Sequence, residues 1–374
     1  MTPKIVYTHN VFAFQAYGGI SRYFVEVIKR IPPETAEIQI FAGFHINEYL
    51  RDLPGVIGIK VPSFRRRGRI QILLNALMQI ARMNLNDLAQ RAFLRPDDRT
   101  IIHVSYYTHP PMKRKGKLVV TVYDMIHELF PQYFPRYDKT TYLKRLCCEQ
   151  ADKIIAISNC TKKDLVSLFG IEPAKIEVIY LGNSLDNVTP TGLSPSFDKP
   201  YLLYVGDRRR GYKNFDRLGE AFTRSPRLRK DFVLVCFGGG AFSPWERMKL
   251  SSLGITHQVY YIEGDDHLFA NYYRHARAFI CPSLYEGFGL PLIEAMGLGC
   301  PVICSNRGPI SEIAGDAGIY FDPDNIGHIQ HVLESAIIDD SLLQEKIKRG
   351  YQRAAMFSWD DTVKETLAVY QSLV

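Results

Sequence analysis

Short runs of apolar residues recur through the first half of the chain, each followed by glycine, proline or polar residues. Such near-continuous runs are typical of strands buried on both faces of a parallel sheet. Several of the segments between them carry apolar residues at helical spacing. We predict strands at Lys4–Thr8, Ile38–Ala42, Val56–Lys60, Ile101–Val104, Lys117–Tyr123, Lys153–Ile157 and Ile176–Tyr180, and helices at Ile20–Ile31, Tyr142–Ala151 and Cys160–Phe169.

Residues 184–200 interrupt this alternation, because they are rich in Ser, Thr, Asn, Gly and Pro and show little periodicity. We interpret them as a linker between two domains. The alternation then resumes. Predicted strands are Tyr201–Val205, Phe232–Phe237, Val259–Ile262, Ala278–Cys281, Val302–Cys304 and Ile319–Phe321, and helices begin near Asn214, Pro244, Leu268, Pro291 and Ser311. The last segment, 358–374, has helical spacing at Trp359, Val363, Leu367 and Tyr370.

Alternating strands and helices in both halves predict an α/β protein with two Rossmann-like domains. We place the first domain at 1–183 and the second at 201–357, on either side of the linker. In open α/β sheets, ligands bind beyond the carboxyl ends of the strands. We therefore expect a ligand site in a cleft where the two domains face each other.

The composition is that of an ordinary globular protein, with 46% hydrophobic and 23% charged residues. The N-terminus shows no signal-peptide pattern, and no apolar run is long enough to span a bilayer. Seven cysteines without a CxxC pair indicate reduced, buried thiols in a cytoplasmic protein rather than a structural zinc site. The net charge of +7 makes an anionic partner plausible: a nucleotide, a membrane surface or a nucleic acid.

One stretch of the second domain combines a turn suited to phosphate with two acids. The apolar run Ala278–Cys281 leads into a loop that carries Glu286, and the helix predicted from Pro291 carries Glu294. Free N–H groups of the Gly287–Leu290 loop and of the helix start lie between the acids, and such groups bind anionic phosphate. Carboxylates can accept hydrogen bonds from sugar hydroxyls. The stretch therefore indicates a nucleotide-sugar site.

A cationic segment follows the first strand of this domain. Arg208, Arg209, Arg210 and Lys213 come directly after Gly206. Arginine suits bidentate contact with phosphate and lysine supplies a mobile charge, although charge runs are usually solvated turns. The position at the carboxyl end of a strand favours phosphate binding over a solvated turn.

A second glycine-rich turn, Gly238–Gly240, also follows a strand. Its glycines either allow a ligand to approach the backbone closely or simply form a tight turn. Neither domain opens with the dinucleotide motif GxGxxG, and the chain contains no P-loop, GxSxG or HExxH motif. These absences weigh against a dehydrogenase, a P-loop enzyme, a serine hydrolase of the α/β type and a zinc protease.

Polar residues follow strands in the first domain as well. Asp124 and His127 come after its most apolar predicted strand. An isolated histidine beside apolar residues is usually structural, but the strand end and the adjacent acids favour a polar site in the cleft. His103, Tyr106 and Tyr107 follow or end another strand, and they either line an acceptor pocket or are plain structural residues.

The segment Arg65–Arg95 contains seven arginines and one acid, Asp87, with apolar residues at helical spacing. Such a segment can lie on an anionic bilayer. It can equally be a domain helix that buries its apolar side and leaves the arginines in solvent. RNA binding is a third alternative, which no recognition module supports.

These residues resemble the retaining glycosyltransferases of family 4, which have the GT-B fold. Glu286-Gly-Phe-Gly-Leu-Pro-Leu-Ile-Glu294 is similar to the EX7E signature of that family, including its interior. The resemblance covers almost the whole chain. Further similar stretches are Ala151–Ser158, Gly170–Gly182, Tyr204–Gly206 with Lys213–Asn214, Ala317–Pro323 and Phe357–Trp359.

The resemblance implies that the second domain binds a nucleotide-sugar donor, that the first binds the acceptor, and that the C-terminal helix crosses back to the first domain. Glu286 would hold sugar hydroxyls and Glu294 the ribose, and an Arg–Lys pair, taken here as Arg209 and Lys213, would hold the diphosphate. The implied donor-binding set is Gly18, Gly19, Gly206, Arg208, Arg209, Lys213, Gly238, Gly264, Glu286, Gly287, Phe288, Gly289, Leu290 and Glu294. The set near the reaction and the acceptor is Glu286, Lys213, Arg209, His127, Asp124, Tyr106 and Tyr107, with Tyr123 where many members have histidine.

The resemblance further implies transfer of a hexose such as mannose or glucose to a glycan or lipid-linked acceptor, with retention of configuration. Cations can neutralise the leaving diphosphate, so we expect neither a metal nor another cofactor. We expect a cytoplasmic enzyme of cell-surface polysaccharide synthesis, at the inner face of the membrane if Arg65–Arg95 binds lipid. The alternatives are a nucleotide-sugar epimerase or hydrolase on the same fold, and a non-catalytic scaffold or nucleic-acid binder.

Overall fold

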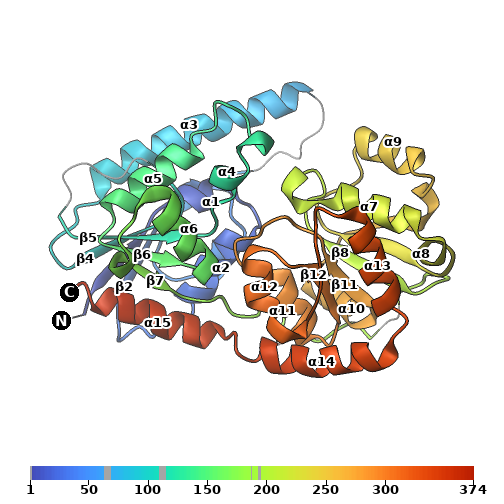
Figure 1. Ribbon diagram of the computed structural model, residues 1–374. Helices are drawn as coiled ribbons and strands as arrows, with labels where there is room; N and C mark the ends of the chain where they lie inside the picture. The colour runs from blue at the N-terminus through green and yellow to red at the C-terminus, as the bar shows by residue number, and fades with distance from the viewer. Residues whose placement is uncertain (1, 63–68, 109–114, 187, 193–194) are drawn as a thin grey trace. The chain divides into compact units, whose positions relative to one another are not determined.

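The computed structural model describes residues 2–62, 69–108, 115–186, 188–192 and 195–374 (Figure 1). The chain divides into two compact units. Unit 1 contains Met1–Glu128, Arg136–Tyr180 and Trp359–Val374, and unit 2 contains Leu129–Pro135 and Leu181–Ser358. The short segment 129–135 therefore packs with the second half of the chain, although it lies within the first half of the sequence.

The described part of unit 1 contains a seven-stranded, fully parallel sheet in the order β3-β2-β1-β4-β5-β6-β7. The order reverses between β1 and β4, which is where an open α/β sheet offers a crevice at its carboxyl edge. The strands are β1 (Lys4–Tyr7), β2 (Glu37–His45), β3 (Val56–Lys60), β4 (Thr100–Val104), β5 (Lys117–Val122), β6 (Lys153–Ala156) and β7 (Ile176–Val178). The helices are α1 (Asn10–Phe14), α2 (Gly19–Ile28), α3 (Arg69–Phe93), α4 (Ile126–Leu129), α5 (Thr140–Gln150), α6 (Asn159–Phe169) and α15 (Trp359–Gln371).

The described part of unit 2 has a six-stranded parallel sheet in the order β10-β9-β8-β11-β12-β13, whose order reverses between β8 and β11. The strands are β8 (Tyr201–Val205), β9 (Val233–Phe237), β10 (Val259–Ile262), β11 (Ala278–Cys281), β12 (Val302–Ser305) and β13 (Gly318–Phe321). The helices are α7 (Phe215–Arg224), α8 (Pro226–Asp231), α9 (Pro244–Ser252), α10 (Asp266–His275), α11 (Leu290–Gly297), α12 (Gly308–Ala314), α13 (Ile326–Ala336) and α14 (Asp340–Ala354).

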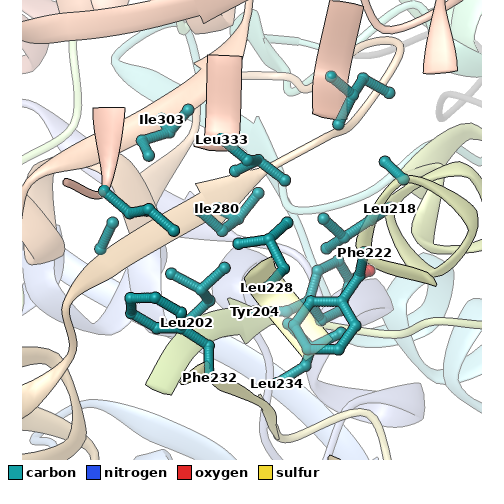
Figure 2. Packing of buried hydrophobic residues seen from close by; sticks show 14 of the residues in the cluster. Leu202, Tyr204, Leu218, Phe222, Leu228, Phe232, Leu234, Ile280, Ile303 and Leu333 are labelled. Atoms are coloured by element: carbon teal, nitrogen blue, oxygen red, sulfur yellow. The ribbon is translucent and has the colours of Figure 1, made fainter. Parts of the chain in front are cut away.

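Alternate residues of the unit 2 strands point into one core. Leu202 and Tyr204 of β8, with Ile280 of β11, meet helix side chains such as Phe222 and Leu333 (Figure 2). All five are almost wholly buried. Burying a large apolar side chain contributes about 1.5–3 kcal/mol, so this layer supplies much of the stability that holds the sheet against α7, α8 and α13.

Two parallel sheets flanked by helices confirm the predicted fold class. The helix predicted over Cys160–Phe169, with its start at Ser158-Asn159, is confirmed as α6, and Ser158 caps it by accepting the N–H of Thr161 at 3.1 Å. Helices α1, α4, α8, α13 and α14 were not predicted. No helix of the described residues combines the length and the apolar character needed to cross a membrane.

Helix α15 belongs to unit 1 and packs on α2. The Tyr370 hydroxyl lies 2.6 Å from His103 Nδ1 and 3.0 Å from the Tyr7 hydroxyl, and all three residues are buried. His103 Nε2 lies 2.8 Å from the Thr121 hydroxyl. His103 is therefore a structural core residue that anchors the C-terminal helix, and the interpretation of it as a pocket residue is wrong.

Helix α3 packs on the rest of unit 1 with its polar side. Asn86 is fully buried and bonds the backbone N–H and C=O of Phe44 in β2, at 2.8 and 3.0 Å. Gln90 and Asp87 contact the buried ring of His9. The apolar side of the helix stays in solvent, with Leu74, Leu77, Met78, Ile80, Leu85 and Leu88 between 43% and 63% exposed. The alternative in which α3 buries its apolar side is wrong; the arginines at 65–67 lie outside the described residues.

Candidate functional site

Two oppositely charged side chains meet at the switch point of the unit 2 sheet. Lys213 follows β8 and Glu286 follows β11, the neighbouring strands between which the strand order reverses. Lys213 Nζ lies 2.7 Å from each carboxylate oxygen of Glu286. Two residues 73 positions apart are thus brought together where an open α/β sheet binds its ligand.

A tight turn after β8 places Lys213. The residues Gly211–Lys213 form a 3-10 turn, and Asn214 adopts a left-handed conformation with φ of 58°. The Asn214 side-chain amide donates to the carbonyls of Pro282 and Pro323 at 3.0 and 2.9 Å. Asparagine suits this position because it tolerates a positive φ and its amide can bond nearby carbonyls. Asn214 thereby fixes the end of the turn.

Glu286 is held by a second contact. The Ser283 hydroxyl donates to Glu286 Oε1 at 2.6 Å, so both Lys213 and Ser283 orient this carboxylate. Burial alone would lower the pKa of Lys213, but the Glu286 carboxylate outweighs burial and raises it. Burial, with a smaller contribution from Glu286, raises the pKa of the neighbouring Cys281 thiol to about 12. At neutral pH the site therefore contains an ammonium group and an un-ionised thiol.

Glu294 lies on α11, the helix that follows the Glu286 loop. Gly289 precedes this helix with φ of 103°, a conformation that favours glycine, and Pro291 lies in its first turn. Glu294 is almost completely buried, and its Oε2 accepts a bond from the Tyr273 hydroxyl at 3.3 Å. Burial and the Glu294 charge raise the pKa of Tyr273, which therefore stays a hydrogen-bond donor.

The loop between the two glutamates is also placed by packing. Phe288 is buried and meets Phe357 edge to face, with ring centroids 5.7 Å apart. Gly287 and Gly289 flank Phe288, and Leu290 begins α11. The backbone of residues 287–290 is thereby anchored by a side chain that points into the unit.

The arginines of the cationic segment occupy different environments. The Arg208 side chain is fully buried, and its Nε donates to Glu246 Oε1 at 2.9 Å. Its remaining nitrogens donate to the carbonyls of Gly238 (3.0 Å) and Gly240. The side chains of Arg209 and Arg210 are 58% and 53% exposed and pair with Asp207. Arg208 thus stabilises the glycine turn from within, whereas Arg209 and Arg210 point to the surface.

The glycine turn packs closely on the β8 loop. Gly238, Gly239 and Gly240 all have positive φ, and a Cβ on Gly239 would lie 2.3 Å from the carbonyl oxygen of Gly206. A Cβ on Gly264, before α10, would lie 2.4 Å from the Leu268 side chain. Packing against backbone therefore requires glycine at Gly239, whereas at Gly238 and Gly240 the positive φ favours it.

Unit 1 places the predicted Gly18–Gly19 loop at the start of α2. The Gln15 side chain accepts the N–H of Ser21 at 3.2 Å, and a Cβ on Gly18 would lie 2.4 Å from Gln15 Oε1. The loop follows α1, which itself comes after β1, on one side of the switch point in this sheet. The absence of a side chain at Gly18 leaves room for Gln15 to close over the helix start.

The predicted acceptor-side residues surround a buried cation that the sequence analysis missed. Lys144 on α5 is fully buried and donates to the Asp124 carbonyl at 2.8 Å and to Glu128 Oε2 at 2.7 Å. His127 Nε2 lies 3.7 Å from Asp138. Burial and the Lys144 charge lower the pKa of His127, although the nearby acids oppose this shift. His127 is therefore mainly neutral at pH 7.

Tyr107 and Tyr123 join this cluster from neighbouring strands. The Tyr107 ring lies 5.4 Å from Lys144 Nζ, and the Tyr107 hydroxyl accepts the N–H of Tyr123 at 3.3 Å. The Tyr123 hydroxyl donates to the carbonyl of Ser105. The Tyr106 ring lies at a tilt of 37° to that of Tyr107, with centroids 4.8 Å apart, and Tyr106 is less buried. Of these tyrosines, Tyr106 is the one with an accessible surface.

The sequence offered little signal for several residues that complete the two sites. Lys144 and Tyr273 lie in helices at positions that periodicity alone does not distinguish from solvent-facing ones. Ser283 lies in the Cys281–Glu286 stretch, but a lone serine carries no specific pattern. Glu246 was detectable only as a helix start, since Ser243-Pro-Trp-Glu246 is a capping box.

Comparison with known proteins relates this architecture to glycosyltransferases. Residues 17–187 match the family model described as Glycosyltransferase Family 4, and residues 193–353 match Glycosyl transferases group 1. The chain is 30% identical over 380 residues to O-antigen chain mannosyltransferase B of Escherichia coli, covering 95% of this chain and 96% of that protein.

Two solved structures share the fold. Sucrose-phosphate synthase from Thermosynechococcus elongatus has a TM-score of 0.78 and 18% identity, covering 100% of this chain and 99% of that one. The HepE protein of Anabaena, solved with UDP and glucose, has a TM-score of 0.71 and 16% identity, covering 100% of both chains.

Proposed function

Because the chain belongs to the glycosyltransferases of the GT-B fold, we propose that it is a retaining, family 4 enzyme that transfers a hexose from a nucleotide-diphosphate sugar to a glycan acceptor. The observation that carries this proposal is the meeting of Lys213 and Glu286 at the switch point of the unit 2 sheet. A cation for the diphosphate and a carboxylate for the sugar hydroxyls lie side by side there. These are the two groups that a nucleotide-sugar site needs.

The donor would lie along the carboxyl edge of the unit 2 strands. Lys213 and the N–H groups at the start of α11 would bind the diphosphate, and Glu294 would accept hydrogen bonds from the ribose. Glu286 would accept hydrogen bonds from the sugar. Arg209, which is exposed on the β8 loop, is the arginine whose guanidinium is accessible for a second phosphate contact. Arg208 is buried and would act indirectly, by donating hydrogen bonds to the carbonyls of the Gly238–Gly240 turn.

Departure of the nucleoside diphosphate is the costly step in this reaction. The bond between the sugar anomeric carbon and the diphosphate oxygen breaks as the acceptor oxygen bonds to the same face of that carbon. The acceptor proton passes to the leaving phosphate oxygen. Lys213 and the helix N–H groups stabilise the charge that develops on the diphosphate. We propose that these groups, together with Arg209, neutralise the diphosphate and that transfer proceeds without a divalent cation.

The name of one relative points to mannose as the hexose. The Escherichia coli relative is named a mannosyltransferase of O-antigen chains and aligns along nearly the whole of this chain. We therefore propose a mannose donor and a growing surface polysaccharide as acceptor. A cluster of Asp124, His127 and Glu128 around Lys144 is the candidate acceptor-facing site of unit 1.

The direct test is a panel of UDP-, GDP- and dTDP-linked mannose and glucose. Thermal shift identifies the donor that binds, and release of nucleoside diphosphate with and without a mannose-containing oligosaccharide measures turnover. We expect one mannose donor to raise the melting temperature and acceptor to increase turnover, with retention seen by NMR of the product. Turnover that is equally fast without acceptor would favour the hydrolase or epimerase alternative. Full activity in EDTA is expected, and its loss would contradict metal-independent transfer.

We further propose that α3 binds an anionic membrane surface. Its outward side carries the exposed apolar residues from Leu74 to Leu88, and the exposed Arg91 and Arg95 lie at and just beyond its C-terminal end. The one acid of the helix, Asp87, is directed to the buried His9. An apolar face bordered by cations suits insertion among anionic lipid headgroups. This location would bring the enzyme to a lipid-linked acceptor.

A further inference from the structure

The segment 129–135 packs on the two loops that carry Lys213 and Glu286. It belongs to unit 2 by its contacts, although it begins at Leu129, the last residue of α4, two residues after His127. Phe134 stacks on Tyr212 with ring centroids 6.3 Å apart and an interplanar angle of 24°. Phe130 meets Tyr285, also with centroids 6.3 Å apart. Tyr212 and Tyr285 are the residues immediately before Lys213 and Glu286.

A third aromatic residue of the segment covers Gly211. A Cβ on Gly211 would lie 2.3 Å from Cε1 of Tyr133, so the Tyr133 ring lies directly against the glycine backbone. Gly211 has an ordinary φ, and its lack of a side chain is therefore needed for this contact rather than for the turn. Tyr133 in turn stacks on Phe130 at 6.3 Å and 26°. All three aromatic residues of the 129–135 segment, Phe130, Tyr133 and Phe134, thus contact one of the two loops or each other.

The two loops are also tied to each other at the point where the segment packs. The N–H of Leu284 donates to the carbonyl of Tyr212 at 2.7 Å. Lys213 Nζ lies 5.8 Å from the Tyr212 ring centroid as it reaches Glu286. A movement of Tyr212 would therefore move both the base of the Lys213 side chain and the loop that leads to Glu286.

From these contacts we infer that Phe130, Tyr133 and Phe134 form an aromatic brace that sets the position of Lys213 relative to Glu286 in the donor site. They are positioning residues, acting through Tyr212, Tyr285 and the backbone of Gly211. This inference rests on the proposed function, because the brace affects catalysis only if Lys213 and Glu286 form the donor site. An error of about 1 Å in the placement of a catalytic group can cost about 100-fold in rate. The brace thus affects turnover without touching the donor.

The test is a double-mutant cycle between Phe134→Ala and Lys213→Ala. The rate is release of nucleoside diphosphate from the UDP-, GDP- or dTDP-linked mannose or glucose that the wild-type enzyme turns over. Because Phe134 acts through Lys213, we expect Phe134→Ala to lower kcat about tenfold in the wild type, with the donor KM changed less than about threefold. In the Lys213→Ala background it should lower kcat less than about twofold. Phe134→Tyr keeps the ring and should restore most of the rate.

A second cycle tests the contact with Gly211. Gly211→Ala should lower kcat in the wild type, because the new Cβ displaces the Tyr133 ring. In a Tyr133→Ala background the same substitution should have little further effect. Phe197→Ala serves as the matched control, since Phe197 is a partly buried aromatic residue that packs on Tyr201 and Tyr260. It should leave kcat unchanged.

The outcomes separate the brace from the proposed function. If Phe134→Ala lowers kcat by the same factor in the wild type and in the Lys213→Ala background, the brace is overturned. It is also overturned if Phe134→Ala keeps the wild-type kcat while Lys213→Ala is slow. Loss of rate in Phe197→Ala to the same degree would also overturn it, because the effect would then reflect packing in general. If Lys213→Ala itself turns over normally, the donor site fails and the brace loses its catalytic role with it.

Discussion

Lys213 Nζ lies 2.7 Å from both carboxylate oxygens of Glu286, and the two side chains are 21% and 15% exposed. A pair this shielded from solvent interacts more strongly than a surface salt bridge. Each partner also has a separate proposed task, the cation at the diphosphate and the carboxylate at the sugar. The pair keeps both groups at the switch point in a defined orientation, so substitution of either one has consequences for the other.

Lys213→Ala is expected to lower kcat by about 100- to 1,000-fold, the cost of removing one charge-stabilising group from a transition state. The donor KM should change much less, because the charge on the diphosphate grows mainly as the bond breaks. Steady-state release of nucleoside diphosphate measures both. Lys249→Ala is a matched control, since Lys249 is 26% exposed and pairs with Asp216 on α7 rather than with Glu286. A Lys213→Ala enzyme with the wild-type kcat would refute the site.

Glu294→Ala should weaken donor binding about 10- to 100-fold, because hydrogen bonds to a charged group are worth about 1.5–3 kcal/mol. The kcat at saturating donor should fall less than the affinity does. Glu294→Gln keeps one oxygen acceptor and the shape of the side chain, and should give an intermediate affinity. Isothermal titration with the nucleotide sugar checks both variants. An unchanged dissociation constant for Glu294→Ala would contradict a ribose contact.

Arg208→Ala is expected to reduce the free energy of unfolding by about 3–5 kcal/mol, because it leaves the buried Glu246 carboxylate without its partner. Arg209→Ala removes an exposed side chain and should change stability by less than about 0.5 kcal/mol. Donor affinity should instead fall in Arg209→Ala. Urea denaturation and donor titration of both variants decide between the two arginines. A stable Arg208→Ala protein that has lost donor binding would reverse the assignment.

The buried His103 predicts a loss of stability in acid. Burial lowers the pKa of His103 from about 6.5 to about 3, so the folded protein keeps the ring neutral while the unfolded chain takes up a proton. Stability should therefore fall as the pH drops below about 6.5, by about 1.4 kcal/mol per pH unit from this group. Urea titrations between about pH 7 and about pH 5 measure the slope. His103→Gln should make the slope shallower; an identical slope would contradict the assignment.

Replacing Leu77, Leu85 and Leu88 together by Asn should reduce sedimentation with vesicles that contain an anionic phospholipid. The melting temperature should stay near that of the wild type, because all three side chains are already exposed. Asn86→Ala is the opposite control, since it removes two buried bonds to Phe44 and should lower the melting temperature without removing the apolar face. If the triple variant binds vesicles like the wild type, or if it only converts a dimer to a monomer, the membrane assignment is wrong.

The sequence was sufficient for the elements that depend on local pattern. Apolar runs ended by glycine or polar residues identified the strands of both sheets, because a strand buried on both faces has no polar side to interrupt its pattern. Glu286 and Glu294 could also be identified in advance, since their spacing, the glycines between them and the helix start all lie in one continuous stretch.

Local sequence patterns do not reveal a side-chain environment that depends on distant parts of the chain. Three consecutive arginines look alike in the sequence, yet Arg208 is buried against Glu246 and Arg209 is exposed. Helix α3 shows the same limit, because periodicity reveals an apolar side and a polar side but not which of them meets the sheet. The buried Lys144 gave no signal at all, since its partners Asp124 and Glu128 come from another segment.

By itself, then, the sequence determined the two alternating domains, the position of the sheet edges and the two glutamates of the candidate donor site. The tertiary structure alone decided that Lys213 pairs with Glu286, that Arg208 is internal, and that residues 129–135 pack beside both loops. The physical reason is that hydrophobic periodicity is a property of neighbouring residues. Burial, charge pairing and aromatic stacking arise between residues that only folding brings together.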